Sequence, residues 1–161
     1  MKNQKGFSLI ELLIVVAIIL IIAAIAIPNL LRSRMAANEA SAVGSLRTIN
    51  TAEVTYSTTY PAQGFAALAS LGGTAATCAT ATGATSTGAC LIDNVLASTA
   101  VKSGYAFTAT AGSGTPAVTY FSKALPSVVG QSGQRAFCSD QSGVIRYNAG
   151  GTACANTDNA L

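Results

Sequence analysis

The sequence predicts an α+β fold in which a long N-terminal α-helix packs on a four-stranded antiparallel β-sheet. An uninterrupted apolar run near the N-terminus leads into an amphipathic helical pattern. Four short β-prone segments lie between glycine-rich turns in the C-terminal half. The chain has 161 residues, enough for one small globular head once the apolar run is set aside. Helix followed by a run of strands is typical of α+β domains.

The expected helix begins with a segment long enough to cross a membrane. From residue 7 to residue 27 only Ser8 and Glu11 are polar, and a helix of that length spans about 30 Å of hydrocarbon. Lys2 and Lys5 precede the run, which favours a cytoplasmic N-terminus and an exported body. These residues alone leave a plain membrane anchor and a secretory signal peptide open as alternatives.

From residue 29 to about residue 58 the helical pattern becomes amphipathic. Apolar residues at three-, four- and seven-residue spacings predict a face that packs on the head, namely Met35, Ala42, Leu46, Ile49 and Tyr56. The charged residues of this stretch are expected on the other face, in solvent or against neighbouring molecules: Arg32, Arg34, Glu39, Arg47 and Glu53. Pro28 separates the two halves and is expected to kink or loosen the helix.

The head is expected to start with a short helical segment at residues 64–73 and a low-complexity surface loop at residues 74–89. The four strands are expected at residues 105–110, 117–122, 135–139 and 144–147. Turns rich in glycine and polar residues join the first and last pairs, which favours a meander. The aromatic residues of these strands are expected in the core or the sheet: Phe107, Tyr120, Phe121, Phe137 and Tyr147.

The four cysteines, Cys78, Cys90, Cys138 and Cys154, follow a membrane-targeting segment and predict two disulfides in an oxidising compartment. Three pairings are possible. The sequence-local bridges, Cys78 with Cys90 and Cys138 with Cys154, are favoured because each closes a short, loop-rich stretch. Each bridge contributes about 3 kcal/mol by restricting the unfolded chain. Free thiols and a metal site are disfavoured, since there is no histidine and no CxxC spacing.

Composition disfavours an enzyme and predicts neither a metal nor a cofactor. Histidine is absent, and the acidic residues show no spacing typical of a paired acid and base. The glycines lack the lysine of a phosphate-binding loop. Nine basic residues face six acidic ones, and two of the basic residues precede the apolar run. The body of the protein is therefore close to neutral and carries no basic footprint for nucleic acid.

Residues 5–16, KGFSLIELLIVV, resemble the signal and N-terminal helix of type IV pilins and type II secretion pseudopilins. The resemblance implies that a prepilin peptidase cuts between Gly6 and Phe7 and methylates the new amino group of Phe7. It also implies a pilin fold with four parts: a leader peptide at residues 1–6, a transmembrane or filament-core helix at 7–28, an amphipathic half-helix at 29–58 and a head at 59–161.

The same resemblance gives Glu11 a role in subunit assembly. A charge at membrane depth costs roughly 2.5 to 3.5 kcal/mol on insertion scales and usually has a partner or a function. In the family this glutamate pairs with the N-terminal amine of a neighbouring subunit. The implied partners are further copies of the chain, prepilin peptidase, the pilus assembly machinery of the inner membrane and the membrane itself. The resemblance also implies that the chain is a single-pass protein of the inner membrane and that it becomes part of a surface pilus after assembly.

Two alternatives remain open at this point. Residues 60–68, YPAQGFAAL, resemble the pattern of the major pseudopilin of type II secretion. The cysteines favour a pilin, and the sparse C-terminal acids, Asp140 and Asp158, disfavour the calcium loop of the pseudopilins. The other alternative is a membrane-anchored binding domain that never polymerises.

Overall fold

The computed structural model describes residues 8–79 and 83–161. Its longest element is helix α1 (Leu9–Thr59), which has 51 residues and stays helical through Pro28. The chain divides within α1 into two compact units, Met1–Arg34 and Met35–Leu161. This division does not test the domain limits expected after residues 6, 28 and 58, and the kink expected at Pro28 stays a prediction.

In the first unit, α1 presents apolar side chains on every side. Every large apolar side chain from Leu9 to Leu31 is exposed, by between 41% and 74%. Among the described residues, α1 is the one helix long and apolar enough to cross a membrane. A helix that is apolar all round requires burial in lipid or among protein neighbours. The first unit therefore leaves a surface that its own side chains do not cover.

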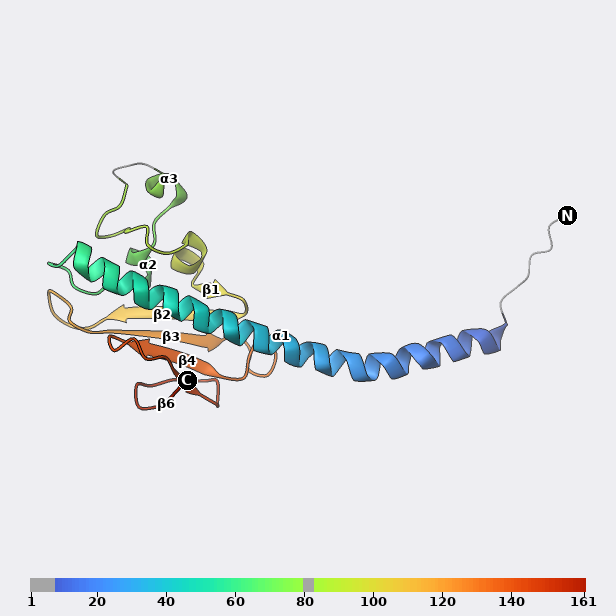
Figure 1. Cartoon of the computed structure of the whole chain (residues 1–161). Coiled ribbons are helices and arrows are strands. Elements are labelled where there is room, and N and C mark those ends of the chain that lie inside the picture. Colours follow the sequence, from blue (N-terminus) through green and yellow to red (C-terminus); the bar gives the residue numbers. More distant parts are fainter. Residues whose placement is uncertain (1–7, 80–82) are drawn as a thin grey trace. The chain divides into compact units, whose positions relative to one another are not determined.

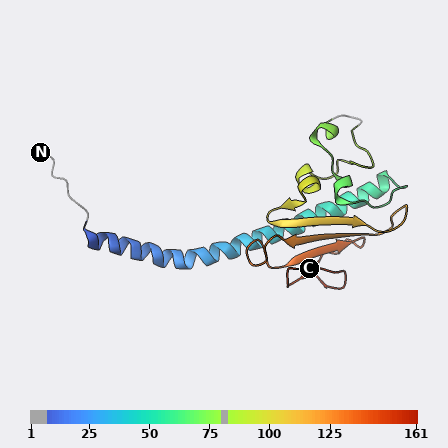
Figure 2. The same cartoon turned by 180° about the vertical axis from the view of Figure 1, so that it is seen from behind.

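The second unit contains a single antiparallel sheet whose strands follow one another in chain order (Figures 1 and 2). The predicted meander is confirmed, but the expected number of four strands is too low. The two additional strands lie at the edges and have two residues each, too few for a sequence pattern to reveal. The six strands are β1 (Val101–Lys102), β2 (Tyr105–Ala111), β3 (Tyr120–Pro126), β4 (Ala136–Asp140), β5 (Arg146–Asn148) and β6 (Asn159–Ala160).

The register of the sheet brings one row of buried side chains together. Phe107 of β2 lies opposite Ala124 of β3, which in turn lies opposite Phe137 of β4. All three side chains are buried, and the small alanine leaves space for the rings on either side. Alternate residues of β2 and β3 are buried in the same way, as expected when one face of a sheet is covered.

The part of α1 from Met35 onward lies along this sheet (Figure 1). Leu46 and Ile49 are fully buried and belong to the same apolar core as Tyr105, Phe107 and Phe137. The helix face predicted from spacing is confirmed at four positions, while Met35 is only half-buried. The four confirmed positions are Ala42, Leu46, Ile49 and Tyr56.

Two of the charged residues expected in solvent are buried instead. Glu39 is 9% exposed and Glu53 is fully buried. Glu39 lies seven residues before Leu46, and Glu53 lies seven residues after it, so both carboxylates fall on the buried stripe of the helix. The prediction was wrong here because it sorted residues by polarity and had no knowledge of hydrogen-bond donors in the head. Arg32, Arg34 and Arg47 are exposed as expected.

Between α1 and the sheet, the described residues form three short helical elements: α2 (Leu68–Leu71), α3 (Ala75–Cys78) and the π-helical turn η1 (Val95–Thr99). The helical segment expected at residues 64–73 is therefore shorter than predicted. These elements lie near the β1 edge of the sheet in both views (Figures 1 and 2). The structure pairs Cys78 with Cys90 and Cys138 with Cys154. The first bridge closes the loop after α2, and the second fastens the C-terminal segment to β4.

Candidate functional site

Glu11, the residue expected to act in assembly, lies in the first turn of α1. The backbone N–H of Ser8 donates a hydrogen bond to Glu11 Oε2 at 2.9 Å. Ser8 immediately precedes the helix, so Ser8 and Glu11 have the spacing of a capping box, in which the glutamate reaches back to the N-cap backbone. A carboxylate here also interacts favourably with the helix dipole. Sequence reasoning missed this local role, although the S-x-x-E pattern was readable.

The capping bond leaves Glu11 able to bind a further cation. It occupies Oε2, while Oε1 has no hydrogen-bond partner among the described residues. Both Ser8 and Glu11 are exposed, so the carboxylate is accessible from outside the chain. The predicted cleavage and methylation positions, Gly6 and Phe7, lie outside the described residues. The structure thus shows an accessible carboxylate at Glu11, and its pairing with a neighbouring subunit stays a prediction.

The apolar surface on both sides of Glu11 is uncovered in the first unit. Burying one large apolar side chain contributes about 1.5 to 3 kcal/mol, and the exposed ones run without a gap from Leu9 to Ile22 apart from Glu11 and Ala17. Small residues interrupt this surface at Ala17, Ala23, Ala24 and Ala26. Small side chains let helices approach closely inside a membrane or a bundle. The surface can therefore be covered by lipid or by like helices.

In the second unit, Glu39 links α1 to the residues that lead into β4. Its Oε1 accepts hydrogen bonds from the backbone N–H groups of Gln134 and Arg135, at 2.9 and 3.1 Å. Its Oε2 lies 2.8 Å from Arg135 Nη2. Burial alone would raise the pKa of Glu39, but these hydrogen bonds and the guanidinium outweigh it and the pKa is lowered. This carboxylate is therefore ionised and structural.

Glu53 has much less compensation for its burial. Its Oε2 accepts one hydrogen bond, from the backbone N–H of Ala66 at 3.0 Å, and its Oε1 has no partner among the described residues. Burial raises the pKa of Glu53 to about 7, and the Ala66 bond only partly opposes that shift. The neighbouring ionisable groups are the hydroxyls of Tyr56 and Tyr120. Neither supplies a positive charge, so the neutral form of Glu53 is favoured.

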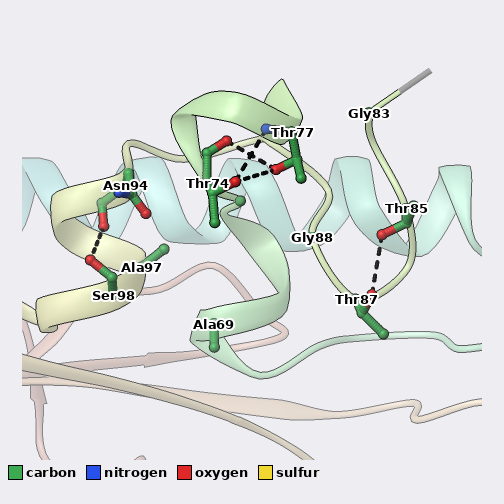
Figure 3. Close-up of a pocket in the computed structure, with 11 residues that line it drawn as sticks. Ala69, Thr74, Thr77, Gly83, Thr85, Thr87, Gly88, Asn94, Ala97 and Ser98 are labelled. Carbon is green, nitrogen blue, oxygen red and sulfur yellow. Dashed lines mark hydrogen bonds between the residues drawn. The ribbon is translucent and has the colours of Figure 1, made fainter. Parts of the chain in front are cut away.

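A hollow of about 390 Å³ lies beside α3 and η1 (Figure 3). Its polar side chains are engaged with one another: the hydroxyls of Thr74 and Thr77 are 2.9 Å apart, and Ser98 donates to the carbonyl of Asn94 at 2.6 Å. The described residues that line it include no charged side chain. Among the described residues, no group of three or more histidine, cysteine or acidic side chains could hold a metal ion. The helix therefore remains the better-supported site.

An exposed apolar helix, long enough to cross a membrane, with an acidic residue in its first turn and lysines ahead of it, is typical of a membrane-anchored protein. The matching family model is the prokaryotic N-terminal methylation motif, which covers residues 1–27. The chain is 67% identical over 39 residues to the type IV wide pilus major component PilA4 of Thermus thermophilus, covering 24% of this chain and 30% of that protein. The chain is thus similar, over part of its length, to major subunits of type IV pili.

A second relative matches a longer stretch of the chain at lower identity. The type IV major pilin protein PilA of Myxococcus xanthus is 46% identical over 54 residues, which is 34% of this chain and 24% of that protein. The matches span less than a third of the length of either relative. No solved structure shows significant similarity to the chain. The similarity therefore covers only part of the chain, and the family model places its match in residues 1–27.

Proposed function

We propose that the chain is the precursor of a structural subunit of a type IV pilus, which polymerises through α1 into a surface filament. The observation that carries the proposal is the apolar surface from Leu9 to Ile27, which is uncovered on every side and contains one acidic residue, Glu11, that caps the helix start. The methylation motif over residues 1–27 supports it. Such a surface requires either lipid or copies of itself, and a filament supplies the copies.

Processing and location follow from the same segment. Prepilin peptidase cuts between Gly6 and Phe7 and methylates Phe7, on the cytoplasmic side of the inner membrane. Lys2 and Lys5 favour that orientation, and the disulfide-bonded head then lies in the oxidising space outside. After assembly, the subunit is part of a filament used for motility, adhesion or DNA uptake.

Assembly exchanges lipid for other copies of the helix, and lipid tails are already as apolar as leucine. The hydrophobic gain from that exchange is therefore small, and the inner-membrane assembly machinery must supply the work. Glu11 supplies register, because its unengaged oxygen can accept the charged amine of Phe7 from a neighbouring subunit. A polar pair inside a helical interface is known to fix axial alignment.

Two substitutions of Glu11 separate its capping role from its charge. Glu11→Gln keeps a side chain that can cap the helix but removes the charge, whereas Glu11→Ala removes both. We expect mass spectrometry to find N-methylated Phe7 at the start of both mature variants. The yield of sheared filaments should fall at least about tenfold in both, because a charge-assisted pair contributes about 1.5 to 3 kcal/mol. Normal filament yield from Glu11→Gln would show that only the cap matters.

A pseudopilus subunit of type II secretion is the second candidate, favoured by the pattern at residues 60–68. Electron microscopy of surface fibres, with mass-spectrometric identification of their subunit, distinguishes the two. Extended surface fibres made of this chain support the pilus. An intact Met1 on the mature chain would instead indicate a plain membrane anchor.

A further inference from the structure

Two arginines, Arg32 and Arg34, follow the apolar segment of α1, and their distance along the helix places them at a defined depth in a membrane. At about 1.5 Å per residue, Arg32 and Arg34 lie roughly 35 and 38 Å along the helix from Leu9. The hydrocarbon core of a bilayer is about 30 Å thick, and the headgroup layers bring the total to about 40 to 45 Å. When the apolar segment spans the membrane, both guanidinium groups therefore fall at the level of the phosphates of the outward-facing leaflet.

Neither arginine is engaged within the part of the chain that the structure describes. Both are exposed, and the two ion pairs found there involve other residues. The next acidic residue along the helix, Glu39, is already paired with Arg135. Two residues along a helix correspond to a rotation of about 200°, so Arg32 and Arg34 point to roughly opposite sides and reach lipid around most of the helix.

The residues just before the arginines complete an interfacial arrangement. Leu30 and Leu31 are apolar and exposed, by 71% and 41%, so hydrocarbon can cover them while the arginine stems extend toward the surface. Long basic side chains at helix ends commonly place their charge at the interface in this way. The guanidinium group also matches phosphate oxygens with two parallel hydrogen bonds.

We propose that Arg32 and Arg34 each bind the phosphate group of an anionic phospholipid in the outward-facing leaflet, which holds the unassembled chain at a fixed depth. This inference rests on the membrane-inserted stage of the proposed function. Positive charge on the exported side of a span is unusual, and a lipid partner gives these two charges a role there before assembly. Entry into a filament then requires that these contacts be released.

The test is native mass spectrometry of the full-length chain in detergent micelles, titrated with phosphatidylglycerol or with phosphatidylcholine. The wild-type chain should retain more phosphatidylglycerol than phosphatidylcholine. The double variant Arg32→Gln/Arg34→Gln should weaken the retention of each bound phosphatidylglycerol by about fivefold, because one basic residue contributes about 1 kcal/mol at an anionic surface. Arg47→Gln is the matched control, because Arg47 is also exposed and unpaired among the described residues but belongs to the head unit.

Several outcomes would overturn the proposal. These are equal retention of the two lipids by wild type, unchanged phosphatidylglycerol retention in the double variant, or an equal loss in Arg47→Gln. Displacement of the lipid by excess inorganic phosphate would show that a free anion is the ligand. A double variant that keeps its lipid but forms fewer filaments would assign the arginines to contacts between subunits. By contrast, a chain that never forms filaments but shows arginine-dependent lipid retention would refute only the proposed function.

Discussion

The two parts of α1 follow opposite rules although they belong to one continuous helix. From Leu9 to Leu31 the large apolar side chains are exposed, whereas Leu46 and Ile49 are completely buried. The acidic residues differ too, because Glu11 is accessible and caps the helix start while Glu53 is enclosed by the head. The head therefore buries one face of the second part of α1. The apolar side chains of the first part must be covered by lipid or by other molecules.

This contrast separates folding from assembly along one element. Substitutions in the second part of α1 should change the stability of the head, because that part lies in its core. Substitutions in the first part should leave the head intact and change membrane or filament contacts. All five tyrosines lie in the second unit, so their near-ultraviolet circular dichroism reports unfolding of the head in the full-length chain.

The largest expected difference is between two leucines of the same helix. Leu46→Ala removes a fully buried side chain and should lower the free energy of unfolding of the head by about 2 to 5 kcal/mol. Leu13→Ala truncates a side chain that is 59% exposed, and this variant should leave the free energy of unfolding of the head unchanged. Urea titration of the full-length variants in detergent, followed by the tyrosine signal, measures both. A comparable loss in the two variants would contradict the division of the helix.

A pair of glycines tests the connection between α1 and the sheet. Gly64 has φ +77°, and a Cβ there would lie 2.6 Å from the backbone nitrogen of Ala117 and still closer to its carbonyl oxygen. Gly64→Ala therefore combines backbone strain with overpacking, and we expect it to lower the free energy of unfolding by about 3 kcal/mol. The measurement is again urea unfolding.

Gly44→Ala is the control for that substitution. Gly44 lies within α1 with nothing within 4 Å of an added Cβ. Alanine is the better helix former by about 1 kcal/mol, so this variant should be slightly more stable than wild type. A loss of stability in Gly44→Ala would show that its surroundings are more crowded than the structure indicates.

Glu53 makes the head less stable as the pH rises. Its folded pKa of about 7 lies above the ordinary value of 4.5, so its contribution is fully present below pH 4.5 and is lost as the pH rises to about 7. Glu53→Gln keeps an acceptor for the Ala66 N–H and cannot ionise. We expect it to stabilise the head at pH 8 by on the order of 2 kcal/mol, with almost no effect near pH 4. An equal change in stability at pH 4 and pH 8 would show that the pKa of Glu53 is not raised in the folded head.

The sequence predicted the features that depend on local pattern and missed those that depend on distant partners. The spacing of Leu46, Ile49 and Tyr56 identified the buried helix face because periodicity alone determines it. The burial of Glu39 was unpredictable, since its donors lie about 95 residues away in the chain. The edge strands β1 and β6 were missed because two residues carry no alternation. By contrast, the capping of Glu11 was present in the local pattern.

Glu39 gives the smallest effect, with a pH dependence opposite to that of Glu53. Its pKa is lowered, so its contribution is present above the unfolded value of 4.5 and is lost as the pH falls through the lower folded pKa. Glu39→Gln keeps an acceptor for the backbone donors but removes the pair with Arg135, whose side chain is 40% exposed. A pair exposed to that degree contributes only about 1 kcal/mol.

Unfolding of Glu39→Gln should therefore be easier than that of wild type by about 1 kcal/mol at pH 7, and the difference should shrink as the pH falls below 4.5. Arg135→Gln is the matched control, because it removes the same pair from the other side and should show a similar loss at pH 7. A deficit in Glu39→Gln that persists at low pH would mean that the amide cannot replace the carboxylate in binding the backbone of Gln134 and Arg135. In that case the link between α1 and β4 depends on hydrogen-bond geometry and not on charge.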